Sequence, residues 1–334
     1  GRPRPRAAEE TDEARWREAL RAHPLVRHVL ALDAFARCWV QEIVLLRALA
    51  PLVATDKGDA YQRLVGAWQT RRDLQFDQAM TALAAPIAAA ACDVERLANP
   101  RFRDTLRDAL RSLVAGQQEN DDQQRAARAL ASRLDAGLRE STERLITIHG
   151  LSGHAADEVR ERLIEHVRTQ GPMHQGKAAA LGGVLSGALS GLAADLAAGG
   201  LSFGAGTLLG AIAGAAGGAG LARGVNVLRG HSDAQVRWDD KLLDGLITSA
   251  LLRYLAVAHF GRGRGEWKES EYPPFWREIV QQTVAARQPA LAALWAQRTL
   301  AANAANLEAG VYSFLREAAR SLLDELYPGA LAAS

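Results

Sequence analysis

The stretch DDQQRAARALASRLDAGLRESTERLITI, residues 121–148, decides the fold class of this chain. Seven of its residues recur every three or four positions: Ala127, Leu130, Leu134, Leu138, Ser141, Leu145 and Ile148. Residues at this spacing share one face of an α-helix, whereas a half-buried strand alternates with a period of two. We therefore expect one helix of roughly 40 Å, at ~1.5 Å per residue, with a single buried stripe.

The same periodicity extends over most of the chain and predicts an all-α, multi-helix bundle. The expected helices cover 9–22, 39–52, 59–97 (interrupted near Pro86), 100–114, 154–170, 233–260, 274–288, 289–305 and 307–326. Residues 25–32 are the one candidate strand, because they include β-branched residues and some alternation. A lone strand needs a sheet supplied from elsewhere; otherwise this stretch is helical. At most one short N-terminal strand, left from a preceding domain, is therefore expected.

Composition excludes several classes of protein. The 334 residues are 48% apolar and carry a net charge of +2, so the chain is neither disordered throughout nor attractive to nucleic acid as a whole. Cys38 and Cys92, both in apolar sequence, are expected to be free, buried thiols. The chain starts with Gly1, and we expect it to be a piece of a longer protein without a secretion signal.

Residues 178–222 stand apart, because these 45 residues contain one charge, Asp195, and 178–224 hold 14 of the 30 glycines. Seven glycines form two rows with a spacing of four: Gly183, Gly187 and Gly191, then Gly206, Gly210, Gly214 and Gly218. Such a row leaves one helical face without side chains, so that another backbone can approach closely. We predict a glycine-zipper hairpin of two helices, near 178–198 and 205–222.

Two environments for this hairpin remain open. Each helix could just cross a bilayer, but the leucines of the first contribute about −2 to −3 kcal/mol to insertion while Asp195 at mid-membrane costs about +2.5 to +3.5 kcal/mol. Because Asp195 lies near the turn, it would limit the depth of insertion. The alternative is a soluble scaffold for interaction or oligomerisation, with the hairpin as buried core.

Other motifs are weaker. Residues 171–178 approach the phosphate-loop pattern but end in Ala178 and contain Pro172, and residues 56–59 (DKGD) are interpreted as a polar turn. His149 and His154 suit a capping or surface role, since no metal-ligand spacing accompanies them. The acidic residues at the start of 233–260 are interpreted as a solvated face: Asp239, Asp240 and Asp244. No catalytic residue, metal site or cofactor is predicted, so the chain is not expected to be an enzyme.

Arg262 and Arg264 lie in a glycine-rich stretch beside Trp267. Guanidinium groups on such a stretch can hold phosphate or lipid headgroups, although structural ion pairs would explain them equally well. We name these three residues as a candidate anion contact.

Three stretches resemble a bacterial family: WREAL at 16–20 through VRHV at 26–29, GALSGLAADLAAGGLSFGAGTLLG at 187–210, and LLRYLAVAHFGRGRGEW at 251–267. In that family an Era-like GTPase domain, of the 50S ribosome-binding type, precedes a helical domain of unknown function. The resemblance divides the chain into 1–40, similar to the end of a G domain; 41–170, a long-helix bundle; 171–230, the glycine-zipper hairpin; and 231–334, a C-terminal helical region. The phosphate loop and base-reading motif of a G domain are absent from this sequence.

The resemblance implies a G domain in cis, and GTP with Mg²⁺ only for that missing domain. We expect a non-catalytic effector half whose hairpin packs against or enters the inner membrane under control of that domain. The implied location is cytoplasmic, in contact with the inner membrane or inserted in it. The implied partners are the G domain, the membrane or a membrane protein, and a second copy of the chain.

Overall fold

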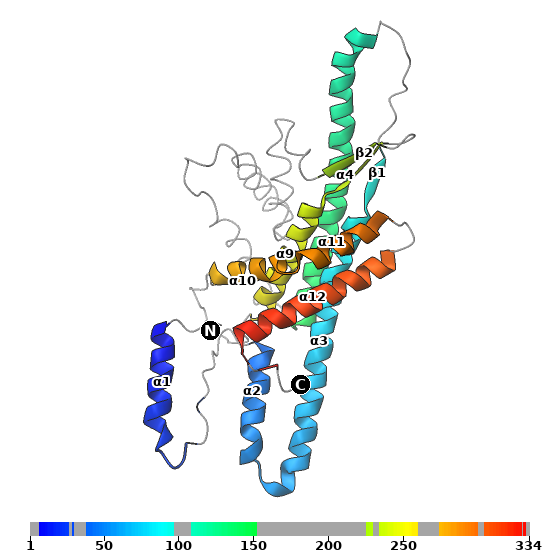
Figure 1. Ribbon diagram of the computed structural model, residues 1–334. Coiled ribbons are helices and arrows are strands. Elements are labelled where there is room, and N and C mark those ends of the chain that lie inside the picture. The colour runs from blue at the N-terminus through cyan, green and yellow to red at the C-terminus, as the bar shows by residue number, and fades with distance from the viewer. Residues whose placement is uncertain are drawn as a thin grey trace.

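The computed structural model describes residues 7–26, 29, 38–96, 108–151, 225–229, 234–259, 274–299, 304–328 and 330–331. These residues are mainly helical, which confirms the all-α prediction (Figure 1). The helices are α1 (Ala7–Arg21), α2 (Trp39–Leu49), α3 (Gly58–Cys92), α4 (Asp108–Ile148), α9 (Asp240–Ala258), α10 (Pro274–Ala285), α11 (Gln288–Ala296) and α12 (Ala304–Leu326). Short 3-10 helices cover Ala50–Leu52, Thr55–Lys57 and Gln297–Thr299.

The long helices α3 and α4 lie side by side, α12 packs along α3, and α9 contacts α3, α4, α10 and α12 (Figure 1). The predicted stripe of α4 faces this core: Leu130, Leu134, Leu138, Ser141 and Leu145 are buried, and Ile148 packs against them. The side chain of Ala127 lies outside the description. The buried face of α4 is therefore the one that the periodicity predicted, and α4 packs against both α3 and α9.

Pro86 does not interrupt α3, contrary to our expectation, because α4 compensates for it. A proline has no N–H to donate to the carbonyl four residues earlier, which here belongs to Ala82. The Ser141 hydroxyl of α4 donates to that oxygen at 2.7 Å. One turn earlier on α4, Gly137 leaves room for the proline ring, since a Cβ there would lie 3.2 Å from the Cβ of Pro86. The serine in the apolar stripe thus has a specific role.

A small antiparallel sheet, in the order β1-β3-β2, was not predicted. Its strands are β1 (Val94–Arg96), β2 (Val225–Arg229) and β3 (Ala234–Trp238). Arg133 of α4 fixes β1 from outside, with Nε and Nη2 donating to both oxygens of Asp93 (2.8 and 2.9 Å) and Nη1 to Glu95 at 2.5 Å. On the interior side of the sheet, the β3 residues Val236 and Trp238 are buried.

The three strands change two of the predicted helix boundaries and the predicted number of strands. We expected helices over 59–97 and 233–260, but α3 ends at Cys92 and α9 begins at Asp240, because 94–96 and 234–238 pair with each other. The expectation of at most one strand, at the N-terminus, was wrong. In the predicted strand 25–32 the described residues Leu25, Val26 and Val29 are not extended strand, and the Val26 amide closes a turn onto the His23 carbonyl at 3.1 Å. Strands of three to five residues are too short for their periodicity to be distinguished from that of neighbouring helices.

Candidate functional site

The site residues predicted from the sequence fall in two stretches, 152–224 and 260–273, that lie outside the described residues. This holds for every glycine of the two rows, for Asp195, and for Arg262, Arg264 and Trp267. Their predicted roles remain predictions. The structure describes the residues that flank the stretch 152–224 in sequence, at the end of α4 and at the start of β2.

The first of these points is the end of α4. Gly150 has a φ of +67°, a left-handed conformation that favours glycine, and the Leu151 amide donates to the Ile146 carbonyl at 3.0 Å. Gln75 of α3 donates to the Ile148 carbonyl at 2.6 Å. The His149 ring nitrogen Nδ1 lies 2.9 Å from the Leu145 carbonyl, which agrees with the capping alternative of the prediction, whereas His154 lies outside the described residues. Helix α4 thus ends at a position that hydrogen bonds define closely.

The second point is β2, which begins at Val225. Val225 pairs with Trp238 in the antiparallel register of β2 and β3, and Trp238 is buried. Arg298 donates to the Trp238 carbonyl at 3.1 Å. Leu151 and Val225, the described residues on either side of 152–224, are therefore each tied to the helical body through the backbone.

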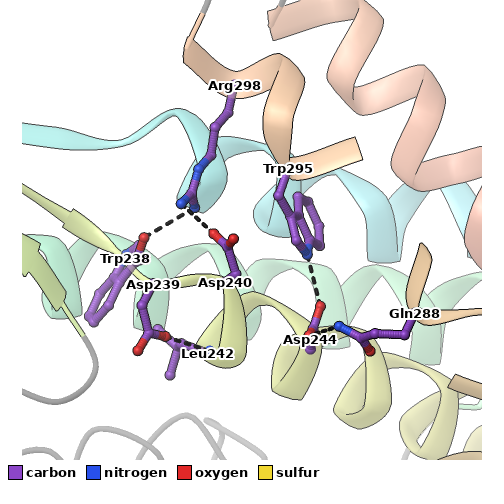
Figure 2. A network of polar contacts seen from close by, with 8 residues as sticks. All are labelled: Trp238, Asp239, Asp240, Leu242, Asp244, Gln288, Trp295 and Arg298. Atoms are coloured by element: carbon purple, nitrogen blue, oxygen red, sulfur yellow. Dashed lines mark hydrogen bonds and ion pairs between the residues drawn. The ribbon is translucent and has the colours of Figure 1, made fainter. Parts of the chain in front are cut away.

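The first turns of α9 form a network of polar contacts, and Figure 2 shows its members pointing toward one another. Asp239 is the N-cap, and its carboxylate accepts from the Leu242 amide at 2.7 Å. Asp240 forms an ion pair with Arg298. Asp244 accepts from the Trp295 indole N–H at 2.8 Å and from the Gln288 amide at 2.7 Å.

This cluster corrects the interpretation of these aspartates as a solvated face only in part, because the Asp240 side chain is 58% exposed although all three carboxylates have protein partners. Each carboxylate holds a different partner, and Asp240 and Asp244 join α9 to α11 and to the 3-10 turn after it (Figure 2). Within the described ranges, no group of three or more His, Cys, Asp or Glu side chains is arranged to hold a metal ion. The cluster is therefore a structural joint between helices.

Arg253, three turns later in α9, lies in a different environment. It is buried, at 4% exposure, against α4. Its Nη1 donates to the Thr142 hydroxyl at 3.1 Å and approaches the Leu138 carbonyl at 3.5 Å. Its Nε and Nη2 have no hydrogen-bond partner among the described residues. Burial lowers the pKa of the guanidinium to about 10, so the group still carries its charge at neutral pH.

An aromatic layer surrounds the next residue, Tyr254. The Trp39 indole donates to the Tyr254 hydroxyl at 3.1 Å, and the Phe76 ring meets the Tyr254 ring edge-on at 5.5 Å. Cys38, beside this layer, is fully buried, and burial raises the pKa of its thiol to about 12. Cys92 is half-buried, and burial raises the pKa of its thiol as well. Both cysteines are free, as predicted, and both are protonated at neutral pH.

His259 ends α9 in a second aromatic layer. Its Nδ1 lies 2.7 Å from the Leu255 carbonyl, and its ring lies 4.6 Å from that of Trp276 and 5.7 Å from that of Tyr327. Burial lowers the pKa of His259 to about 4, so the ring is neutral at pH 7. In the described part of the chain its Nε2 has no hydrogen-bond partner. The ring therefore acts here as a packed core residue.

Sequence reasoning had placed Arg253 only at the start of the stretch that runs to Trp267. A signal was present: Arg253 interrupts the otherwise apolar run ITSALLRYLAVAHF at 247–260. Pattern alone could not show that this arginine faces α4, because a long arginine side chain often reaches solvent from an apolar surface.

In the described residues, no helix is long and apolar enough to cross a membrane. No curated protein and no solved structure matches the chain. A comparison with known families matches residues 17–326 to the family described as "Domain of unknown function (DUF3482)". Since the match covers more than half of the 334 residues, this chain belongs to the DUF3482 family.

Proposed function

We propose that this chain is the non-catalytic, helical effector half of a bacterial GTPase-family protein. In this proposal the glycine-zipper hairpin packs against or enters the inner membrane, and a G domain in cis controls when it does so. The helical body serves as the frame from which the hairpin acts. GTP and Mg²⁺ would bind the G domain and not these residues.

One observation carries the proposal: a well-packed body holds both ends of a segment whose composition differs sharply from its own. The buried faces of α3, α4, α9 and α12 share one continuous core. The segment between Leu151 and Val225 includes the 45 residues with a single charge and two rows of glycines at a spacing of four. Close-packed helices in membranes use small residues at this spacing. A frame that fixes the two ends can transmit a rearrangement to such a segment without itself unfolding.

The test is flotation of the full chain with vesicles of phosphatidylethanolamine and phosphatidylglycerol. Gly187→Leu with Gly210→Leu places a large side chain in each row and should lower the bound fraction about tenfold, the equivalent of ~1.4 kcal/mol. Gly66→Leu is the matched control, because Gly66 is exposed on α3 and a Cβ there meets nothing within 4 Å. An unchanged bound fraction for the double variant would contradict the role of the two glycine rows in membrane binding.

The competing function, a soluble scaffold with the hairpin as core, gives a different result in the same experiment. The wild-type chain would then be monodisperse without detergent and would not float with vesicles. The proposal also expects no GTP hydrolysis by these 334 residues. Phosphate release above the buffer blank, abolished by a variant of this chain, would contradict the non-catalytic assignment.

A further inference from the structure

One face of α3 carries apolar side chains that the described residues leave uncovered. Leu64 and Leu74 on this face are 59% and 58% exposed, respectively. They belong to a row, called the α3 seam below, in which spacings of four and three residues alternate and every member is exposed: Ala60, Leu64, Ala67, Arg71, Leu74 and Gln78. This is the spacing of the a and d positions of a coiled coil. Two exposed leucines alone would need no explanation, but a regular seam of about five helical turns does.

The α3 seam lies on a part of the helix that extends away from the rest of the body. Figure 1 shows α2 and the N-terminal half of α3 projecting past the point where α12 crosses α3. The opposite side of this half of α3 is already occupied, because Val65, Arg72 and Phe76 are buried. The seam is therefore the side of α3 that can receive a further helix.

We propose that the α3 seam is the contact surface between two copies of this chain, which pack their α3 helices antiparallel about a two-fold axis at the level of Gln69. A symmetric pair uses the same surface twice, so the surface must complement itself. In this register Leu64 of each copy meets Leu74 of the other. Ala67 meets Arg71, and the small alanine leaves room for the arginine stem while its guanidinium reaches solvent. This inference goes beyond the proposed function and does not depend on it.

The charges beside the seam complement each other in the same register. Arg63, directly before Leu64, is exposed. Asp77 follows Leu74 by three residues and lies on the same edge of the seam. When Leu64 meets Leu74, Arg63 of each copy therefore faces Asp77 of the other, as flanking charges do in coiled coils. The Asp77 carboxylate already pairs with Arg316 at 2.8 Å, but its side chain is 37% exposed and can accept from a second guanidinium.

Other arrangements of two α3 seams are less favourable. A parallel pair would place Arg71 against Arg71 of the second copy, and like charges at such a contact repel. An antiparallel pair shifted by one heptad would place Leu74 against Lys57 in one direction and against Arg71 in the other. Among these arrangements, the register centred on Gln69 is the one that pairs both leucines.

Sedimentation equilibrium of the full chain over a range of concentrations tests whether the seam forms the contact. The wild-type chain should dimerise, and Leu64→Glu should raise the dissociation constant at least about tenfold, because it places a carboxylate against Leu74. Arg63→Glu should raise it by a smaller factor, since it brings a second carboxylate near Asp77. Leu25→Glu is the matched control, because Leu25 is 84% exposed and lies outside α3. A monomeric wild-type chain, or a dimer that Leu64→Glu leaves intact, would overturn the proposal.

Cysteine cross-linking tests the register of the two helices. A mixture of the Leu64→Cys and Leu74→Cys chains should give a cross-linked dimer with a short bismaleimide, because these positions meet across the contact. Each variant alone should give much less, since like positions lie about 15 Å apart along the helix at ~1.5 Å per residue. The wild-type chain, with its free Cys38 and Cys92, gives the background. Strong cross-linking of Leu64→Cys alone would indicate a parallel pair, and a mixture at background would show that a second copy does not cover the seam. Either result would overturn the proposal.

Discussion

The ionisable side chains at the two ends of α9 lie in opposite environments. At the N-terminal end, Asp239 caps α9 through the Leu242 amide, while Asp240 and Asp244 join the helix to Arg298 and Trp295 (Figure 2). Toward the C-terminal end, Arg253 and His259 are buried among neutral groups, each with a nitrogen that has no partner among the described residues. The first end is a completed joint. At the second, both side chains are buried in the interior of the helical body.

The largest effect is expected at the aromatic layer beside Arg253. Tyr254→Ala removes a fully buried ring and leaves the Trp39 indole without its acceptor, so it should lower the free energy of unfolding by about 3–5 kcal/mol. Tyr254→Phe keeps the ring and should cost about 1 kcal/mol. Urea unfolding measures both, and equal losses for the two variants would show that packing is not what Tyr254 contributes.

His259 predicts a pH dependence that belongs to the C-terminal end alone. Burial lowers its pKa from 6.5 to about 4. Between these two pH values the unfolded chain binds a proton at this residue, whereas the folded chain does not. The contribution is complete above pH 6.5 and is lost as the pH falls toward 4, by up to about 3 kcal/mol. Relative to wild type, His259→Phe should have a flatter unfolding free energy between pH 4 and 6.5. Parallel curves for the two proteins would contradict the neutral, buried ring.

At the N-terminal end, Asp244→Ala should cost about 1–3 kcal/mol, because the buried Trp295 indole loses its acceptor. Asp244→Asn keeps an oxygen for that bond and should cost less. The indole fluorescence of the folded protein, compared between the two variants, reports whether Trp295 has moved. A neutral Asp244→Ala variant would mean that the joint between α9 and α11 does not depend on this carboxylate.

The smallest effect is expected at the cap. Asp239→Ala should cost about 1 kcal/mol, whereas Asp239→Ser retains an acceptor for the Leu242 amide and should cost little. We therefore expect the loss in unfolding free energy to decrease in the order Tyr254, His259, Asp244, Asp239. This order would show that buried residues of α9 contribute more to stability than its polar contacts near the surface. A larger loss at Asp239 than at Tyr254 would reverse that conclusion.

The sequence predicted those parts of the structure that periodicity controls. The described members of the α4 stripe and the two free cysteines were found as expected, and the contact of His149 with the Leu145 carbonyl fits the capping alternative. The unbroken α3 was not foreseeable, because its Pro86 is tolerated through Ser141 and Gly137 of another helix. The same reason applies to the aspartates of α9, whose partners lie 44 to 58 residues away in sequence. Pattern reveals which face of a helix is buried, but only tertiary structure reveals which polar group it meets.

The candidate functional residues show the same division between what the sequence predicts and what the tertiary structure reveals. Composition and spacing pointed to the glycine rows, to Asp195 and to the Arg262–Trp267 stretch, all of which lie outside the described residues. The structure instead drew attention to Arg253, whose burial no sequence pattern reports.

Hydrogen–deuterium exchange of the full chain, with and without phosphatidylglycerol-containing vesicles, tests most directly the claim that a stable body carries a segment acting on membranes. The account predicts that vesicles change the protection of peptides from 178–222, while peptides of α3 and α12 remain unchanged. Identical exchange in both conditions, or changes spread evenly over α3, α4, α9 and α12, would contradict it.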